Sequence, residues 1–430
     1  MIASVSHAPP ASRLAKVSWA LYDCGSSAFS AVIVTFVFAT YFSEGIARTS
    51  VEGTAEWGWA MTVSALTVAI MSPVIGAIAD IRGRRKPWLG VFTVIAVVGT
   101  AMLWYAEPHH SFVTYTLIVV IVANIAFEAA AVFYNAMLPD LARGDDIGRL
   151  SGWGWGLGYM GGLSCLIVAL FAFVQAAEPL FGLDKASAEQ VRVVGPLVAL
   201  WMGVLTIPLL LFTPDTRSTG ISIATAIHQG LKQLHNTFKD LRKHRTIALF
   251  LLARMIYNDG LNTLFAFGGI FAAGTFGMPL AEVIKFGILL NVTAGIGAIG
   301  FAWVDDWIGA KRTILIALVG LIVTGTIAIS VEDVTLFWIA GAFLGIFVGP
   351  AQAASRSLMG RIAPPEMRNE MFGLYALSGK ATAFLGPFVL GTVTFWTDSQ
   401  RLGMATILAF FIAGGIMLAM LSLPHRRPAN

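Results

Sequence analysis

Charge is scarce in this chain. Only 12% of its 430 residues are Asp, Glu, Lys or Arg, whereas 57% are hydrophobic and the mean hydropathy is +0.77. Soluble domains carry about 25% charged residues, so this chain has roughly half of the charge that a folded surface needs in water. The composition argues against a soluble enzyme and favours a protein that folds in the hydrocarbon core of a membrane.

Cysteine and histidine are scarce as well. The two cysteines, Cys24 and Cys165, lie in apolar stretches, and two cysteines cannot form a disulfide framework or a four-ligand zinc site. All seven histidines lie in loops or tails, which excludes a histidine relay within a membrane. We therefore expect no metal site, and any proton carrier within the membrane must be a carboxylate.

Nucleotide-binding motifs are missing too. Residues 156–161 have the glycine spacing of a dinucleotide site, but they lie inside an apolar stretch with no strand before it. Lys380 resembles the lysine of a phosphate-binding loop, yet no Ser or Thr follows it and Leu374 stands where such a loop needs glycine. We expect no cofactor, and ATP is not assigned as the energy source.

Long apolar segments dominate what is present. Each can cross a bilayer, which takes about 20 helical residues, and a helix satisfies its own backbone in lipid. The alternating pattern of barrel strands is absent. The first segment is too long for a cleavable signal and carries Asp23, so we expect it to remain in the mature protein. The sequence predicts an all-α membrane protein with twelve transmembrane helices, at 17–43, 57–79, 88–106, 112–138, 150–177, 193–212, 246–273, 281–304, 313–330, 334–359, 370–396 and 402–423.

Lysine and arginine are distributed unevenly between the loops. With the N-terminus inside, 20 of the 28 basic residues lie in inner loops and tails, 4 in outer loops and 4 within the apolar segments. Inner loops of membrane proteins carry the excess of positive charge. We therefore expect both termini in the cytoplasm and the protein in the inner membrane, with the lipid bilayer as its partner. The basic run 82–86 is then an orientation signal, and we expect no nucleic-acid partner.

One sizeable polar stretch, 213–245, separates two groups of six apolar segments. Its apolar residues recur every three or four positions, at Ile223, Ile227, Leu231, Leu234, Phe238 and Leu241. Basic residues flank this stripe, which predicts a cytoplasmic amphipathic linker helix on the membrane surface. We expect an N-terminal six-helix bundle at 1–212 and a C-terminal six-helix bundle at 246–430.

The two halves carry similar motifs in the same order, as expected for pseudo-symmetric bundles. Tyr-Asp-Cys-Gly at 22–25 matches Tyr-Asn-Asp-Gly at 257–260, and Leu-Ser-Gly at 150–152 matches Met-Phe-Gly at 371–373. An acid, a glycine and a base recur 226 residues apart, in hairpins after the second and eighth segments. The candidate functional residues of these two hairpins are Gly76, Asp80, Gly83, Arg84, Arg85, Asp306 and Gly309.

Twelve segments in two similar halves, with a G-x3-D-x-x-G-[RK]-[RK] hairpin, resemble the major facilitator superfamily. More narrowly, the chain resembles its vacuolar amino-acid effluxer-like branch, also labelled unknown major facilitators. The resemblance departs at Ile81, where the superfamily usually has a base, and at 24–26, where relatives commonly have Trp-Ala-Asn. The residues that carry it span nearly the whole chain: Trp19, Tyr22, Asp23, Ser27, Phe29, Tyr134, Asn135, Pro139, Ser151, Gly152, Gly158, Gly161, Gly162, Arg254, 257–260, Gly349, Pro350, Gln352, Ser355, Arg356, 372–375 and 378–380.

The resemblance implies more than the fold. Such hairpins are implied to hold neighbouring helices in one conformation and to release them in the other. The substrates implied are amino acids, moved by export or by proton-linked exchange.

Six ionisable residues, three acids and three bases, fall well inside the apolar segments. A charge at mid-bilayer costs roughly 2.5–3.5 kcal/mol even on the mild insertion scale, so these residues need partners or a water-filled cavity. Asp259 lies five residues after Arg254, about 140° around the helix, so we expect it to meet a base from another helix. The predicted substrate and ion pathway is Asp23, Glu128, Asn124, Arg254, Asn258, Asp259, Asn262, Gln352, Arg356 and Lys380. The alternative is that these residues form static pairs that hold the helices together.

These patterns predict a secondary active transporter without enzymatic activity. It would rock its halves about a central site and move a small polar metabolite by alternating access, with amino acids exported or exchanged and protons as candidate coupling ions. We expect a monomer. Export of amphiphilic drugs or other metabolites is an alternative, suggested by Trp153, Trp155, Tyr159 and Trp201. A membrane sensor or scaffold that does not transport is an alternative of another class.

Overall fold

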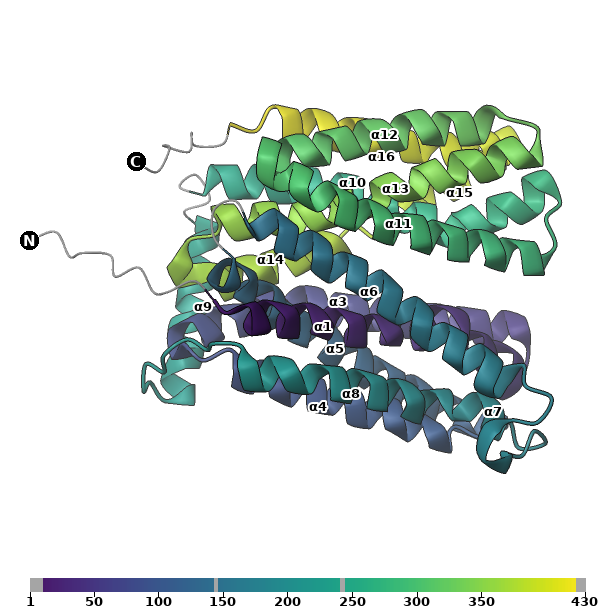
Figure 1. Cartoon of the computed structure of the whole chain (residues 1–430), viewed down its shortest axis with the longest axis horizontal. Coiled ribbons are helices and arrows are strands. Elements are labelled where there is room, and N and C mark those ends of the chain that lie inside the picture. The colour runs from purple at the N-terminus through teal and green to yellow at the C-terminus, as the bar shows by residue number, and fades with distance from the viewer. Residues whose placement is uncertain (1–10, 143–145, 240–243, 423–430) are drawn as a thin grey trace, which may run out of the picture.

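The computed structural model describes residues 11–142, 146–239 and 244–422. Most of the long helices run side by side along one direction (Figure 1). The α-helices are α1 (Arg13–Ala28), α2 (Phe38–Tyr41), α3 (Ser50–Arg82), α4 (Lys86–Met102), α5 (Val113–Leu141), α6 (Ile147–Val168), α7 (Glu189–Arg192), α8 (Val194–Phe212), α9 (Ile223–Lys239), α10 (Arg245–Phe276), α11 (Leu280–Ile308), α12 (Ala310–Ser330), α13 (Val334–Ile362), α14 (Arg368–Lys380), α15 (Leu385–Thr397) and α16 (Gln400–Ala419). Each of the twelve predicted segments corresponds to helical structure, which confirms the all-α membrane fold.

Eleven helical stretches of the described chain are long and apolar enough to cross a membrane. The helix α10 is not among them although it is 32 residues long and lies within the bundle. It carries Arg254, Asn258, Asp259 and Asn262, which lower its hydropathy. The sequence nevertheless predicts a segment at 246–273, and the structure places α10 among the other helices of the bundle.

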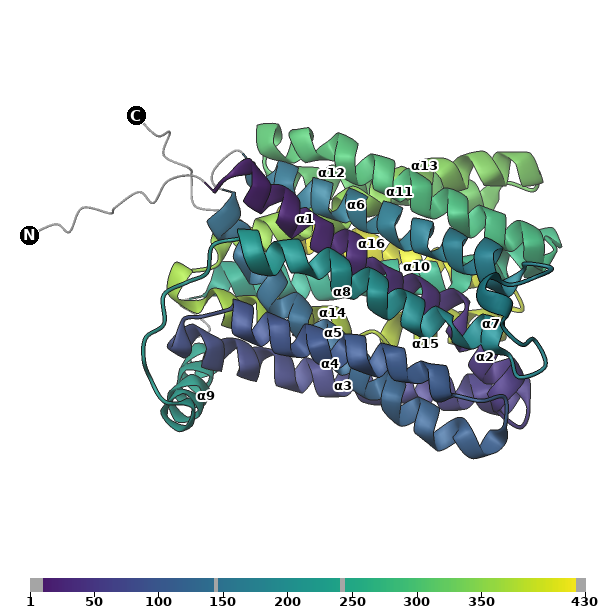
Figure 2. The ribbon, with the colours of Figure 1, turned by 60° about the horizontal axis from the view of Figure 1, so that its bottom comes forward.

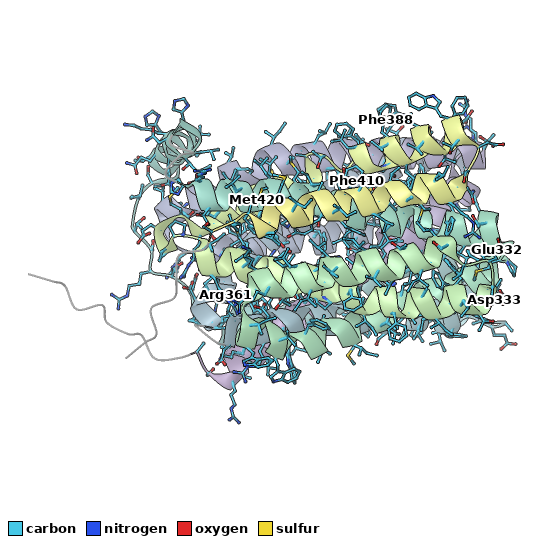
Figure 3. The ribbon with its side chains drawn as sticks, turned by 90° about the horizontal axis from the view of Figure 1, so that it is seen from above. Glu332, Asp333, Arg361, Phe388, Phe410 and Met420 are labelled. Carbon is cyan, nitrogen blue, oxygen red and sulfur yellow. The ribbon has the colours of Figure 1, made fainter. Side chains whose placement is uncertain are left out.

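The outer surface of the bundle is apolar along its length. Large side chains such as Ile70, Leu200 and Phe388 are more than half exposed, as expected for residues that contact lipid. Figure 3 shows Arg361 at one end of the bundle and Glu332 and Asp333 at the opposite end. We call the end where α1 begins the terminal end, and the opposite end the far end.

We call α1–α8 the N-terminal half and α10–α16 the C-terminal half, following their order in the chain. Figure 1 shows α6 and α14 along the boundary between them. The helix α6 packs on α11 of the other half, and α14 packs on α3 of the other half. In each contact, one helix of a half packs on a helix of the other half, as expected for two halves related by a pseudo-two-fold axis.

The linker contains a helix, α9, that lies crosswise to the bundle at the terminal end (Figures 1 and 2). Ala226 and Gly230 on one face are buried where α9 packs on α3, while Ile227 and Leu231 on the apolar stripe are exposed. An exposed apolar stripe is the feature that a helix on a membrane surface presents to lipid, so the membrane-surface position stays a prediction. Leu241 of the stripe lies outside the described residues, as do the chain ends 1–10 and 423–430.

Two predicted segments differ locally from a regular α-helix. The first changes to π-helix from Phe29 to Phe36. The eleventh, predicted as one helix at 370–396, is divided into α14 and α15 by a turn at 381–384. Discontinuous helices of this kind leave backbone groups free for binding within the membrane.

Candidate functional site

One ion pair joins the two halves midway along the bundle. The Nζ atom of Lys380 on α14 lies 2.8 Å from Oε1 of Glu128 on α5. Glu128 is 13 residues from the end of α5 at Leu141, which is about 20 Å at 1.5 Å per residue. The side chains of Glu128 and Lys380 remain 21% and 33% exposed. The mid-length pair is therefore not fully buried.

The break in the eleventh segment positions Lys380, which is the last residue of α14. A cation is favourable at a helix C-terminus because the unpaired carbonyls there carry partial negative charge. The amides of Asn258 and Asn262 on α10 donate to the carbonyl of Gly379, at 3.4 and 3.5 Å. Two predicted pathway residues, Asn258 and Asn262, thus contact the end of α14, and the predicted residue Lys380 is that end.

A second ion pair between the halves lies closer to the terminal end. Nη1 of Arg356, on α13, donates to Oδ2 of Asp23 on α1 at 2.8 Å. Its Nε and Nη2 atoms donate to the hydroxyl and the carbonyl of Ser151, at 3.0 and 2.6 Å. The guanidinium also lies over the rings of Trp19 and Trp155, at 4.9 and 5.6 Å from their centroids. Arg356 is only 3% exposed, so this pair acts as a buried clamp between the halves.

Asp80 of the first hairpin caps a helix of the opposite half. Its carboxylate accepts hydrogen bonds from the backbone N–H groups of Asn369 and Glu370, at 3.1 and 2.8 Å, and from the amide of Asn369 at 2.7 Å. These groups form the first turn of α14, where unpaired N–H groups and the helix dipole favour an anion. Asp80 thereby fastens α3 to α14 at the terminal end.

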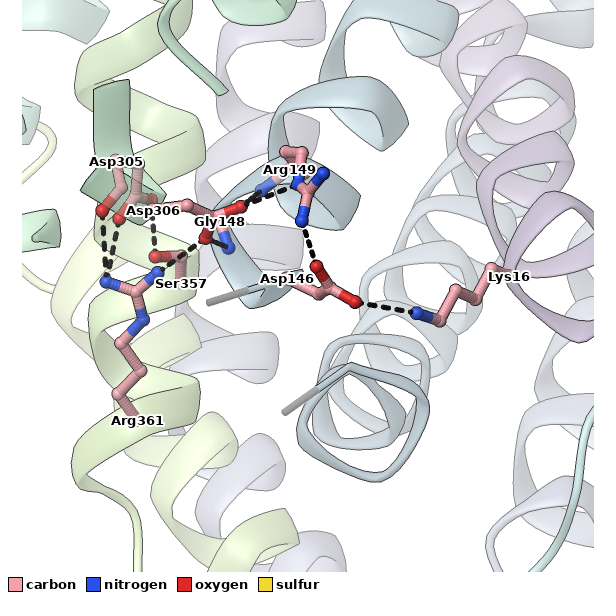
Figure 4. A network of polar contacts seen from close by, with 8 residues as sticks. All are labelled: Lys16, Asp146, Gly148, Arg149, Asp305, Asp306, Ser357 and Arg361. Carbon is pink, nitrogen blue, oxygen red and sulfur yellow. Dashed lines mark hydrogen bonds and ion pairs between the residues drawn. The ribbon is translucent and has the colours of Figure 1, made fainter. Parts of the chain in front are cut away.

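Asp306 makes the corresponding contact in the opposite direction (Figure 4). It lies on α11 and accepts from the backbone N–H groups of Gly148 and Arg149 at the beginning of α6, at 2.7 and 2.9 Å. Arg361 pairs with Asp305 at 2.9 Å and with Asp306 at 3.0 Å. Each half therefore caps a helix of the other half with a hairpin aspartate.

The other hairpin residues have different places. Asp140 on α5 pairs with both Arg85 and Arg368, which ties the first hairpin to the beginning of α14. Gly83 and Gly309 end α3 and α11 with φ angles of 89° and 91°, a conformation that favours glycine. Arg84 is exposed.

Arg254 and Asp259 do not have the partners expected from the sequence. Arg254 donates to the carbonyl of Tyr375 and the hydroxyl of Ser378, at 2.8 and 2.7 Å, and stacks on the Tyr375 ring. Asp259 accepts from the backbone N–H of Gly386 at 3.0 Å. Among the described residues it meets no base, so the expectation that Asp259 pairs with a base from another helix was wrong.

Two predicted pathway residues lie apart from these contacts. The Asn124 amide donates to the Ser64 hydroxyl at 2.6 Å, a contact within the N-terminal half, and Gln352 on α13 is half-buried. Sequence reasoning did not assign contacts to Ser151, Ser378 or Gly386. Each contacts a predicted charge from a different helix, so no spacing along one helix could have indicated it.

Neutralising the caps should weaken closure at the terminal end. Asp80→Asn and Asp306→Asn keep the side-chain shape but replace charge-assisted hydrogen bonds, worth about 1.5–3 kcal/mol, with neutral ones. Spin labels at the exposed positions Arg84 and Glu366, one in each half, should then report a larger share of long separations. The matched control is Asp333→Asn, because Asp333 caps its own helix α13 at the far end. Unchanged distances in both hairpin variants would show that the caps do not hold the halves together.

Sequence comparison identifies relatives along almost the whole chain. Residues 46–429 match the model of the family described as "Vacuole effluxer Atg22 like". The "Uncharacterized MFS-type transporter YxiO" of Bacillus subtilis (strain 168) is 27% identical over 405 residues, covering 94% of this chain and 93% of the relative. "Autophagy-related protein 22" of Saccharomyces cerevisiae (strain ATCC 204508 / S288c) is 23% identical over 427 residues, covering 85% and 76%.

Solved structures of membrane transporters share the fold. The proton:xylose symporter XylE aligns with a TM-score of 0.73 at 13% identity, covering 94% of each chain. A bacterial homologue of the iron transporter ferroportin, in an outward-facing state, aligns with a TM-score of 0.69 at 13% identity, covering 94% of this chain and 98% of the other. With the family match over most of the chain and this fold, the protein belongs to the Atg22-like vacuole effluxer family and is an integral membrane secondary transporter of the major facilitator superfamily, not an enzyme.

Proposed function

We propose that this transporter moves a small zwitterionic metabolite, with amino acids as the class to test first. The observation that carries the proposal is the partly exposed Glu128–Lys380 pair, with one member on each half at mid-length. A zwitterion can place its ammonium group on Glu128 and its carboxylate on Lys380, so each of these charges exchanges one partner for another. Separation of the two halves then need not leave either charge unpaired.

The direction of access follows from the position of the clamps. By their positions along the helices, the two hairpin caps and the Asp23–Arg356 pair lie between the Glu128–Lys380 pair and the terminal end. The excess of Lys and Arg in the predicted inner loops supports a cytoplasmic terminal end. The conformation described here is then closed toward the cytoplasm, and substrate reaches the site from the far end.

Proteoliposomes test the proposal directly. We expect counterflow of at least one of the twenty protein amino acids with purified protein, measured with and without a pH gradient. Glu128→Gln and Lys380→Met should each weaken apparent affinity roughly tenfold to hundredfold, since each removes a charge-assisted contact of about 1.5–3 kcal/mol.

The controls are Glu178→Gln and Lys285→Met, which change exposed charges away from the pair and should transport as the wild type does. Amino-acid counterflow that is unchanged in both Glu128→Gln and Lys380→Met would contradict the assignment. Binding without any counterflow would instead support a sensor. Of the aromatic residues behind the drug-export alternative, Trp155 packs against Tyr159 and lies by Arg356. Trp153 instead is 46% exposed and contacts Trp303, so the set does not line one common site.

A further inference from the structure

The carboxyl group of Asp259 takes part in none of the ion pairs described above. It lies near the middle of α10 and is 1% exposed. Its Oδ2 atom accepts the N–H of Gly386, in the first turn of α15, at 3.0 Å. Its Oδ1 atom is buried and has no hydrogen-bond partner among the described residues. The group therefore has one backbone donor and almost no exposed surface.

The charged groups around Asp259 are occupied elsewhere. Arg254 on the same helix donates to Tyr375 and Ser378, and Lys380 on α14 pairs with Glu128. Arg401 on α16 donates to the carbonyl of Ile329. The helix α15 has no titratable side chain.

The bases of the remaining neighbours, α11 and α13, are also placed elsewhere. Lys285 on α11 is exposed, and on α13 Arg356 pairs with Asp23 while Arg361 pairs with Asp305 and Asp306. The acids of these two helices that form pairs, Asp305 and Asp306, do so at the terminal end, and Glu282 lies in the first turn of α11. No cation among the described residues therefore compensates a charge on Asp259.

A single N–H donor cannot replace the hydration of an ionised carboxylate. An unpaired buried charge costs far more than one unpaired O–H group, so the neutral acid is the stable form in this environment. The close contact between α10 and α15 also leaves little room for water beside Asp259. A Cβ atom at Gly386 would lie 2.0 Å from Oγ1 of Thr263, one turn after Asp259, so only glycine permits this approach.

We propose that Asp259 is a proton-binding site, with its proton held while α15 is packed on α10 and released when the two helices separate. On separation the carboxyl loses the Gly386 N–H, gains water and transfers its proton to that water, leaving a hydrated carboxylate. Repacking of α15 takes up one proton from water. Protons are then the coupling ion, an assignment that rests on the transport function proposed above.

Infrared difference spectroscopy tests protonation without any substrate. At pH 7 the spectrum of the wild type minus Asp259→Asn should contain the C=O stretching band of a protonated carboxyl group. The control Glu178→Gln changes an exposed carboxyl, and its difference spectrum should lack this band. A wild-type minus Asp259→Asn spectrum with only carboxylate bands would overturn the proposal.

A second pair of variants tests the link to helix packing. Gly386→Ala should push α15 away from α10, admit water and reduce the protonated-carboxyl band at pH 7. Gly391 lies on the same helix, and no atom lies within 4 Å of a Cβ added there. The control Gly391→Ala should therefore leave the band intact. A full band in Gly386→Ala would show that the proton is independent of the α10–α15 contact.

Transport separates this proposal from the proposed substrate class. With amino acids that the wild type transports, Asp259→Asn should lose accumulation driven by a pH gradient, and equal gradient-driven accumulation in both proteins would overturn proton coupling through Asp259. If the wild type moves no amino acid, the substrate proposal fails, while the infrared band still decides whether Asp259 holds a proton.

Discussion

Valine at Gly76 should prevent the two halves from closing at the terminal end and abolish turnover. A Cβ atom at Gly76 would lie 2.3 Å from the carbonyl oxygen of Asn369 and 2.9 Å from the backbone nitrogen of Glu370. These are backbone atoms of α14, so they cannot move aside as a flexible side chain can. The collision would also separate Asp80 from the N–H groups that it caps. We expect a transporter that stays folded but open at the terminal end.

The distance between spin labels at Arg84 and Glu366 measures this effect. It should shift toward longer values in Gly76→Val, whereas Gly58→Val should match the wild type, because Gly58 lies on the same helix with no atom within 4 Å of an added Cβ. Substrate counterflow should be lost in Gly76→Val only. Wild-type distances together with wild-type counterflow in Gly76→Val would show that α3 and α14 do not need to approach this closely.

Loss of Arg356 should produce the largest decrease in stability. Arg356→Met removes the ion pair with Asp23 and both hydrogen bonds to Ser151, and it leaves Asp23 in a mostly buried position without a partner. Breaking a buried pair by removing one member costs about 3–5 kcal/mol, because the remaining charge is uncompensated. Thermal unfolding of the purified protein in detergent should therefore begin at a clearly lower temperature.

A double-mutant cycle identifies the source of that loss. Asp23→Asn combined with Arg356→Met should recover part of the stability, since the uncompensated charge is removed. Arg48→Met, at an exposed loop position, should change stability by about 0.5 kcal/mol or less. Additive effects of the two substitutions would indicate that Asp23 and Arg356 do not stabilise each other and that the contact is not a clamp.

The hydropathy pattern predicted where the helices are, because each helix satisfies its own backbone in lipid and this requirement is local. Hydropathy predicted the structure least well in the segments that carry polar residues. The eleventh segment was predicted as continuous, yet the chain turns after Lys380, and the free carbonyl of Gly379 is bound by Asn258 and Asn262 from α10. A helix break that other helices satisfy is decided by tertiary contacts.

The sequence could not predict which acid pairs with which base, for a related reason. Three acids and three bases permit several combinations, and helical spacing reports only which residues share a face of one helix. Packing joined Asp23 with Arg356 and Glu128 with Lys380, but gave Arg254 and Asp259 neutral partners. The aspartate hairpins were recognised as motifs, whereas their targets, the first turns of α14 and α6 in the opposite halves, became visible only in the structure.

The sequence by itself determined that this protein lies in a membrane and that it is helical, because composition and periodicity reflect the solvent around each segment. Its motifs also carried the resemblance to a transporter family. Only the tertiary structure decided which charges face each other across the halves and which carboxyl group is left without a cation. Those outcomes depend on residues up to 333 positions apart being brought within hydrogen-bonding distance, as Asp23 and Arg356 are. No pattern within a single helix contains that information.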